Sequence, residues 1–181
     1  MDRQPVLEGD RLLLRPLAPA DWDALFAVAA DREIWAIHPA HDRWQEPVFR
    51  AYFADALAQG GAMTVIDKST GAIIGSSRWQ GHDPADGGSV EIGWTFLARS
   101  HWAGRYNPEL KRLMLAHAFC FVRRVLFRVG ESNGRSRRAM EKIGGRLTGT
   151  IDYTQMSGRE IAHVVYEITA NDFAAGPIGR G

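Results

Sequence analysis

The most informative stretch of the sequence, residues 89–115, reads SVEIGWTFLARSHWAGRYNPELKRLML. In its first nine residues apolar side chains alternate with polar or small ones, which is the period-two pattern of a β-strand with one apolar face. The polar or small positions are Ser89, Glu91, Gly93 and Thr95. We therefore predict a strand over 89–97 that presents Glu91 on its polar face.

A helix is predicted directly after this strand, beyond a short loop that contains Gly104. Asn107 can cap the helix, Pro108 suits its first position and Glu109 its first turn. Free backbone N–H groups and the positive end of the helix dipole meet at such a start, so it can bind a phosphate, and Arg105 adds charge beside it. On these residues alone an ordinary strand-to-helix turn remains the other interpretation.

The flanking segments predict a mixed sheet covered by helices, of class α/β or α+β. Asp21 is the expected cap of the first helix. Further strands are predicted over 11–17, 63–67, 72–79, 124–130 and 163–169. Helices are predicted from residue 19 to 29 and over 47–59, 108–122 and 134–144. The strands first form hairpins and later alternate with helices.

The length of 181 residues fits one domain, expected over 1–173, followed by a flexible tail over 174–181. A net charge of +1 argues against nucleic-acid binding and against a polybasic membrane patch. The sequence shows no secretion segment and no apolar run that could span a membrane, which predicts a cytoplasmic protein.

Cysteine and histidine usage predicts neither a disulfide nor a metal site. Cys120 is the sole cysteine and lies in an apolar helical stretch, where a buried, inert thiol is expected. His38 and His41 share an aromatic-rich loop, but Pro39 makes a helical pair of ligands unlikely and no third ligand is evident. We therefore expect no metal.

Basic residues are concentrated in two segments, 99–112 and 123–138. Such segments can hold a small anion. Solvated helix faces are the other interpretation, and charge alone favours it. Neither a Gly-x-Gly-x-x-Gly nor a Gly-Lys-Ser/Thr element occurs, which argues against dinucleotide binding and against Walker-type nucleotide binding.

Four motifs, taken in order, resemble those of the GNAT acetyltransferase superfamily, and specifically its RimJ/RimL-type branch. They lie at residues 7–17, 91–94, 102–111 and 133–144, so the resemblance spans roughly residues 7–169. It implies a single-domain, mixed and largely antiparallel sheet that is flanked by helices and splayed between its fourth and fifth strands. It also implies that acetyl-CoA binds in the split, with its pyrophosphate on the loop.

The resemblance implies a set of coenzyme contacts from the loop and from the late helix. The predicted residues are Trp102, Ala103, Gly104, Arg105, Tyr106, Asn107, Asn133 and Ser136. Two positions depart from the family pattern. Arg105 stands where the loop usually has a second glycine, and its cation can compensate there. Met140 stands where many members carry a tyrosine general acid, so Ser136, a water molecule or Tyr106 must protonate the thiolate, or no side chain does so.

The implied reaction is attack of an amine on the thioester, with a strand amide stabilising the oxyanion. Glu91 is the candidate general base, because it lies on the polar face of the strand that leads into the loop. An ordinary outward carboxylate or salt-bridge partner is an equally good interpretation of Glu91, and His101 is a weaker candidate base. Glu91 and Ser136 are thus the predicted catalytic residues.

The acceptor is a protein N-terminus or a small-molecule amine. Residues 31–46 and 150–160 are its expected walls, and they hold no carboxylate run that would select a polycation. Two other functions remain open: a non-catalytic acyl-CoA sensor of the same fold, and an unrelated module that binds a phosphate ligand. A homodimer is compatible with the sequence, although no feature demonstrates one.

Overall fold

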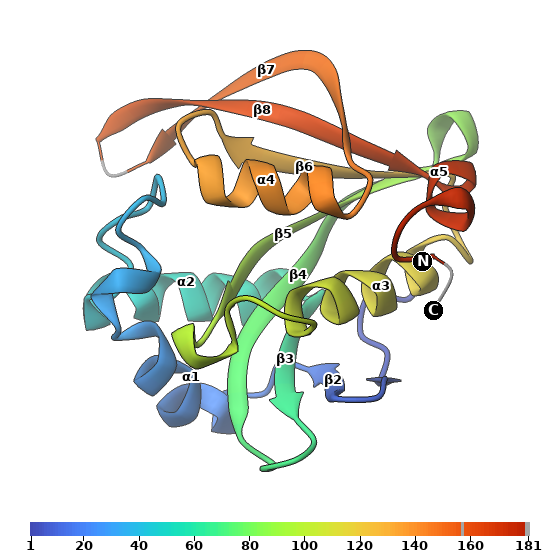
Figure 1. Cartoon of the computed structure of the whole chain (residues 1–181). Coiled ribbons are helices and arrows are strands. Elements are labelled where there is room, and N and C mark those ends of the chain that lie inside the picture. Colours follow the sequence, from blue (N-terminus) through green and yellow to red (C-terminus); the bar gives the residue numbers. More distant parts are fainter. Residues whose placement is uncertain (157, 180–181) are drawn as a thin grey trace.

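Eight strands form one twisted sheet in the computed structural model, which describes residues 1–156 and 158–179 (Figure 1). Their spatial order is β1-β2-β3-β4-β5-β6-β8-β7, and every neighbouring pair is antiparallel except β5 with β6. The strands are β1 (Leu7–Glu8), β2 (Leu12–Pro16), β3 (Ala62–Asp67), β4 (Ile73–Asp83), β5 (Ser89–Leu97), β6 (Arg124–Gly130), β7 (Arg146–Met156) and β8 (Arg159–Thr169). The predicted mixed, largely antiparallel sheet is confirmed.

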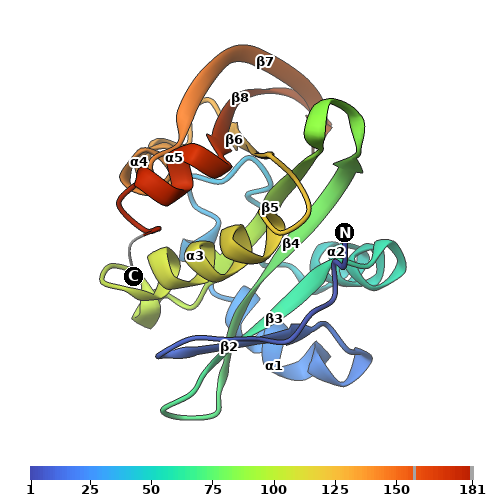
Figure 2. The ribbon, with the colours of Figure 1, turned by 90° about the vertical axis from the view of Figure 1, so that its right-hand side faces the viewer.

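Helices cover both faces of the sheet (Figure 2). On one face lie α1 (Trp22–Ala29) and α2 (Glu46–Gln59), which bury an aromatic cluster that includes Trp35, Phe49 and Phe96. On the other lie α3 (Tyr106–Ala118), α4 (Gly134–Lys142) and α5 (Ala170–Ala175). The apolar residues of α3 and α4 pack with those of β2–β6 and β8 in a second cluster. Two cores therefore hold the sheet between them.

The sheet opens between β5 and β6. Only three residue pairs join these two strands, from Ser89 with Arg124 to Glu91 with Leu126. Beyond Glu91, β5 stays paired with β4 as far as Leu97, whereas β6 stays paired with β8 as far as Gly130. These are the predicted fourth and fifth strands, since β1 adds one short strand before them, and the predicted splay is confirmed.

A bulge in β5 aims side chains into this opening. Arg78 pairs with Gly93 and Ser76 with Phe96, so Ser77 faces the two intervening residues of β5. Trp94 adopts the left-handed region with a φ of 53°, which is costly for a bulky residue and marks the bulge. The simple alternation predicted for β5 is broken at this point.

Neither expected helix cap forms a side-chain capping hydrogen bond. Asp21 precedes α1 without capping it, and its carboxylate accepts hydrogen bonds from Arg15, at 2.6 and 2.8 Å, and from the Thr64 hydroxyl at 2.7 Å. The α3 helix begins at Tyr106, so Asn107 lies inside its first turn rather than at its cap.

Sequence patterns did not reveal the strand β7 or the exposure of Cys120. No strand was predicted over β7, whose side chains are almost all exposed, so the sequence there shows no apolar alternation. Cys120 is exposed rather than buried, because α3 ends at Ala118 and the thiol lies in the following turn.

The boundary of the expected tail stays a prediction. Ala174 and Ala175 end α5, and Ile178 packs against the core formed by α3 and α4. Residues 180 and 181 lie outside the described residues. Among the residues described, no helix is long and apolar enough to cross a membrane.

Candidate active site

Two cavities meet where the sheet opens. The loop cavity, of about 330 Å³, lies between the end of β5, the segment after it and α4, and Trp102 and Gly104 line it. The sheet cavity, of about 410 Å³, lies between β5, β6 and the 38–43 loop, and Glu91 and Phe127 line it. Both are lined by the same five residues where they join, namely His38, Thr95, Asn107, Ser136 and Ala139.

The loop after β5 has an unusual backbone. The φ angles of Ala103 and Gly104 are 60° and 72°, so two successive residues are left-handed and the chain turns sharply before α3. Trp102 fixes the start of this turn, because its indole N–H donates to the Leu97 carbonyl at 2.9 Å. Arg105 has a φ of −102°, which any residue adopts, so the absence of a second glycine there costs no strain.

Two of the predicted coenzyme residues lie outside both cavities. The exposed Arg105 side chain lines neither cavity. Tyr106 lines neither cavity, since its hydroxyl lies 3.3 Å from an Asp67 carboxylate oxygen and its ring packs on His101. The other predicted loop residues, Trp102, Ala103, Gly104 and Asn107, all line the loop cavity.

The start of α4 brings Asn133 and Ser136 to the site in different ways. Asn133 is buried and caps α4, because its side-chain oxygen accepts from the Ser136 backbone N–H at 3.1 Å. It lines the sheet cavity, whereas Ser136 lines both cavities. Within the described residues the Ser136 hydroxyl has no hydrogen-bond partner, so it is available to a ligand.

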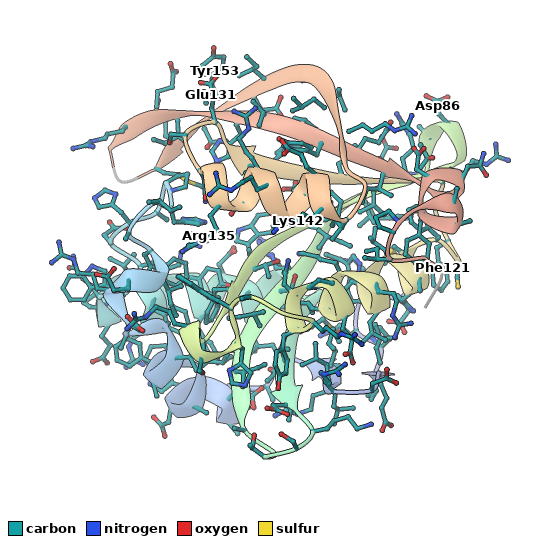
Figure 3. All side chains as sticks on the ribbon, in the orientation of Figure 1. Asp86, Phe121, Glu131, Arg135, Lys142 and Tyr153 are labelled. Carbon is teal, nitrogen blue, oxygen red and sulfur yellow. The ribbon has the colours of Figure 1, made fainter. Side chains whose placement is uncertain are left out.

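Three cations on α4 were not singled out by sequence reasoning. Arg135, Arg138 and Lys142 line the loop cavity, and Figure 3 labels the first and last of them. The Arg135 guanidinium stacks on the Trp102 ring, 4.0 Å from its centroid, and donates to the Ile34 carbonyl at 2.9 Å. The signal was present, since positions i, i+3 and i+7 share one helix face.

Glu91 lines the sheet cavity but is not a free carboxylate. It forms an ion pair with Arg128, whose Nε also donates to Asp152 at 2.6 Å. Burial raises the pKa of Glu91 above its usual value, although the Arg128 charge and hydrogen bonds oppose this rise. Glu91 is therefore a salt-bridge partner that also lines the cavity, and its role as the general base stays a prediction.

The two histidines nearest the loop cavity differ in their surroundings. His101 lies 3.2 Å from Asp67, which ties the segment after β5 to the end of β3. Burial, and then the charges of Arg43 and Arg135, lower the pKa of His38 to about 3. His38 is therefore a neutral imidazole at pH 7 and a weak base.

Met140, at the position where many family members carry a tyrosine, is buried and lines the sheet cavity. Lys111 lines the same cavity and was not predicted to do so. Its ammonium donates to the Thr95 hydroxyl at 2.6 Å, and burial lowers its pKa to about 7. Among the described residues no group of three or more His, Cys, Asp or Glu side chains could hold a metal ion.

Comparison with known proteins gives one family and many related folds. The model of the acetyltransferase (GNAT) domain matches residues 11–146. A GCN5-related N-acetyltransferase from Brucella melitensis is 24% identical, with a TM-score of 0.82 over 98% of this chain and 83% of that chain.

Two further structures of similar fold are complexes with ligands. Mycobacterium smegmatis RimJ, in complex with CoA-disulfide, is 20% identical, with a TM-score of 0.70 over 89% of this chain and 83% of that one. Vibrio cholerae spermidine N-acetyltransferase, in complex with CoA and spermine, is 16% identical, with a TM-score of 0.69 over 91% of this chain and 98% of that one. At these identities the three structures establish the fold.

Proposed function

Since this chain belongs to the acetyltransferase (GNAT) family, we propose that it transfers the acetyl group of acetyl-CoA to a primary amine that enters the sheet cavity. It is an N-acetyltransferase by family and by fold. The observation that carries the proposal is the junction of the two cavities at Thr95, Asn107 and Ser136, in the opening of the sheet. One cavity suits a long anionic coenzyme, and the other suits its acceptor.

The loop cavity has the chemistry to hold coenzyme A. Arg138 and Lys142 face it, and neither has an ion-pair partner among the described residues. Unpaired cations and backbone N–H groups at the start of α3 are suited to phosphate groups. The Ser136 hydroxyl supplies a free donor at the junction. In this proposal Trp102, Ala103, Gly104 and Asn107 form the wall along which the coenzyme lies.

The reaction needs few groups. The amine nitrogen attacks the thioester carbonyl, a C–N bond forms and the C–S bond breaks. Glu91, directly or through water, takes the proton that the amine loses, and the unpaired edge of β5 stabilises the oxyanion. The departing thiolate takes a proton from Ser136 or from water, because Met140 cannot donate one and the Tyr106 hydroxyl is directed to Asp67.

The branch and the acceptor are finer proposals. RimJ-like relatives share the fold at 20% identity, which is compatible with the RimJ/RimL-type motifs of this sequence. A ribosomal-protein-S5-alanine acetyltransferase and a spermidine N-acetyltransferase are also similar in fold. We assign the acceptor to the same broad class, either a protein N-terminus or a small-molecule amine.

Calorimetric titration with acetyl-CoA tests the coenzyme site, with ATP and NAD as control ligands. We expect micromolar binding of acetyl-CoA alone, and at least about tenfold weaker binding by Ser136→Ala, the loss of roughly one hydrogen bond. Ser136→Ala is preferable to a substitution of Asn133, because Asn133 also caps α4.

Turnover is then followed on a panel of primary amines by mass spectrometry of the products. A thiol reagent would also label the exposed Cys120, so product detection is the cleaner assay. Acetylation of at least one amine supports the proposal. No binding of acetyl-CoA would contradict it, and binding without turnover of any amine would indicate a sensor of the same fold.

A further inference from the structure

Two buried basic side chains line the sheet cavity. Lys111 is 2% exposed and Arg43 is 9% exposed, and both line this cavity. Among the described residues neither forms an ion pair. An isolated buried charge costs several kcal/mol unless it is paired, so a protein rarely retains one without a use for it.

Lys111 comes from the buried face of α3, together with Met114, Leu115 and Ala118. Its ammonium contacts the Thr95 hydroxyl at 2.6 Å and lies 5.6 Å from the centroid of the Phe127 ring. Burial alone lowers its pKa to about 7, with no charged neighbour contributing. Since Thr95 lines both cavities, the ammonium lies beside the place where they join.

Arg43 reaches the cavity from the opposite wall, in the loop before α2. Its guanidinium lies 4.6 Å from the centroid of the Tyr52 ring and 5.3 Å from that of Trp35. Aromatic faces hold a guanidinium in place but leave its N–H donors free in its plane. Asp42, its neighbour in sequence, acts on Arg43 electrostatically and opposes the effect of burial on its pKa.

The remaining ionisable groups of the cavity do not neutralise these two cations. Glu91 is already matched by Arg128, which also binds Asp152. Burial lowers the pKa of His38 to about 3, and it lowers the pKa of His163 as well. Both imidazole rings are therefore uncharged at pH 7 and above. With Arg43 charged and Lys111 protonated below about pH 7, the described lining carries more positive than negative charge.

We propose that the acceptor is an amine that also carries a carboxylate, and that Lys111 and Arg43 bind this carboxylate while the amine faces the thioester. The inference rests on the proposed function and narrows its substrate class. A carboxylate would form an ion pair with Lys111 and Arg43, and it would accept hydrogen bonds from the N–H groups of Arg43. A polycation would instead add to the excess charge, so polyamines are excluded as good acceptors.

Matched acceptor pairs test this directly. Each L-amino acid is compared with its carboxamide, which keeps the amine and side chain but removes the charge. We expect the wild type to acetylate carboxylates at least about 30-fold faster in kcat/KM, the effect of one buried charge pair. In Lys111→Met and Arg43→Met the rate with carboxylates falls by a similar factor, while the rate with carboxamides changes less than about threefold.

Controls separate this outcome from a failure of the proposed function. Lys68→Met removes a lysine that pairs with Glu8 and lines neither cavity, so this variant should keep the preference for carboxylates. Acetyl-CoA binding by each variant shows that it is folded and holds the coenzyme. Equal rates with carboxylates and carboxamides in the wild type would overturn the inference. So would an equal loss on both classes in Lys111→Met, which would assign Lys111 to the reaction itself.

A second readout follows the titration of Lys111 in the wild-type protein. The chain has only three lysines, so lysine labelled with ¹³C at the ε carbon gives three NMR signals, and loss of one in Lys111→Met assigns Lys111. With coenzyme A bound, an added amino acid acceptor should raise the titration midpoint of Lys111, because an anion favours the ammonium form. If neither the amino acids nor their amides move this midpoint, the carboxylate does not bind at Lys111.

Discussion

At the scale of single residues, Glu91 is the proposed general base of the reaction. Burial raises the pKa of its carboxyl group, with the Arg128 ion pair opposing the rise. A raised pKa makes the carboxylate a better base at neutral pH, because its proton affinity is then closer to that of the amine. The ion pair with Arg128 also fixes the carboxylate at the wall of the sheet cavity.

Glu91→Gln should therefore lower kcat about 10²- to 10⁴-fold with any accepted amine. The wild-type kcat should fall as the pH drops through the raised pKa of Glu91, because the base works only when deprotonated. Steady-state rates from pH 5 to 9 check both effects. Glu131→Gln, on the exposed turn before α4, is the matched control and should behave as the wild type (Figure 3). If kcat of Glu91→Gln falls at acidic pH in the same way as kcat of the wild type, another group is responsible for this pH dependence.

Asp21 is a buried carboxylate with several hydrogen-bond donors. Burial alone would raise its pKa, but hydrogen bonds from Arg15, the Ala18 N–H and Thr64 outweigh burial and lower it. A carboxyl group with a lowered folded-state pKa stabilises the fold at neutral pH, and this contribution is lost as the pH falls through that pKa.

Asp21→Asn should thus cost roughly 1–3 kcal/mol in the free energy of unfolding at pH 7. The difference from wild type should shrink steadily below about pH 4, where the wild-type carboxyl group also becomes protonated. Urea unfolding at several pH values measures this, with the exposed Asp23→Asn as control. A difference that stays constant down to pH 3 would show that the charge of Asp21 is not what matters.

At the scale of elements, α4 forms the cationic wall of the loop cavity. Arg138→Gln combined with Lys142→Gln should weaken acetyl-CoA binding about tenfold or more, and should reduce its dependence on salt, because both cations face the expected phosphate groups. Calorimetry at two salt concentrations measures both changes. Arg137, on the same helix, binds Tyr166 and the Glu131 carbonyl instead and lines neither cavity. Arg137→Gln should keep the affinity, and an equal loss in that variant would point to damage to the helix.

Sequence reasoning succeeded where a segment carries its own periodic signal. The alternation over 89–97 and the short apolar run over 124–130 predicted β5 and β6 with their observed bounds. The exposed strand β7 has no such signal, because its pairing with β8 and not its own apolar pattern holds it in place.

The parts of the site that sequence reasoning missed depend on the fold around them. Lys111 is buried because α3 packs against β5 and β6. Its residue type alone would predict an exposed side chain, since lysine is rarely buried. Likewise the hydrogen bonds of Asp21 and Tyr106 go to partners on β2 and β3. Helix periodicity would have revealed the α4 cations, but charge alone favoured a solvated face.

At the scale of the whole molecule, two cores hold a sheet that is joined only by three residue pairs at its middle. The half with β1–β5 packs on α1 and α2, and the apolar residues of α3 and α4 form one cluster with strands of this half and of the half with β6–β8. We propose that acetyl-CoA occupies the opening between these halves. A ligand there would pair with the free edge of β5 and stabilise the fold by binding only its native state.

Hydrogen–deuterium exchange with and without acetyl-CoA tests this claim most directly. We predict that acetyl-CoA slows amide exchange at least about tenfold over 92–97 and 102–107, while β2 and β3 exchange at unchanged rates. Protection elsewhere, with these two segments unaffected, would contradict the claim and place the coenzyme outside the opening of the sheet.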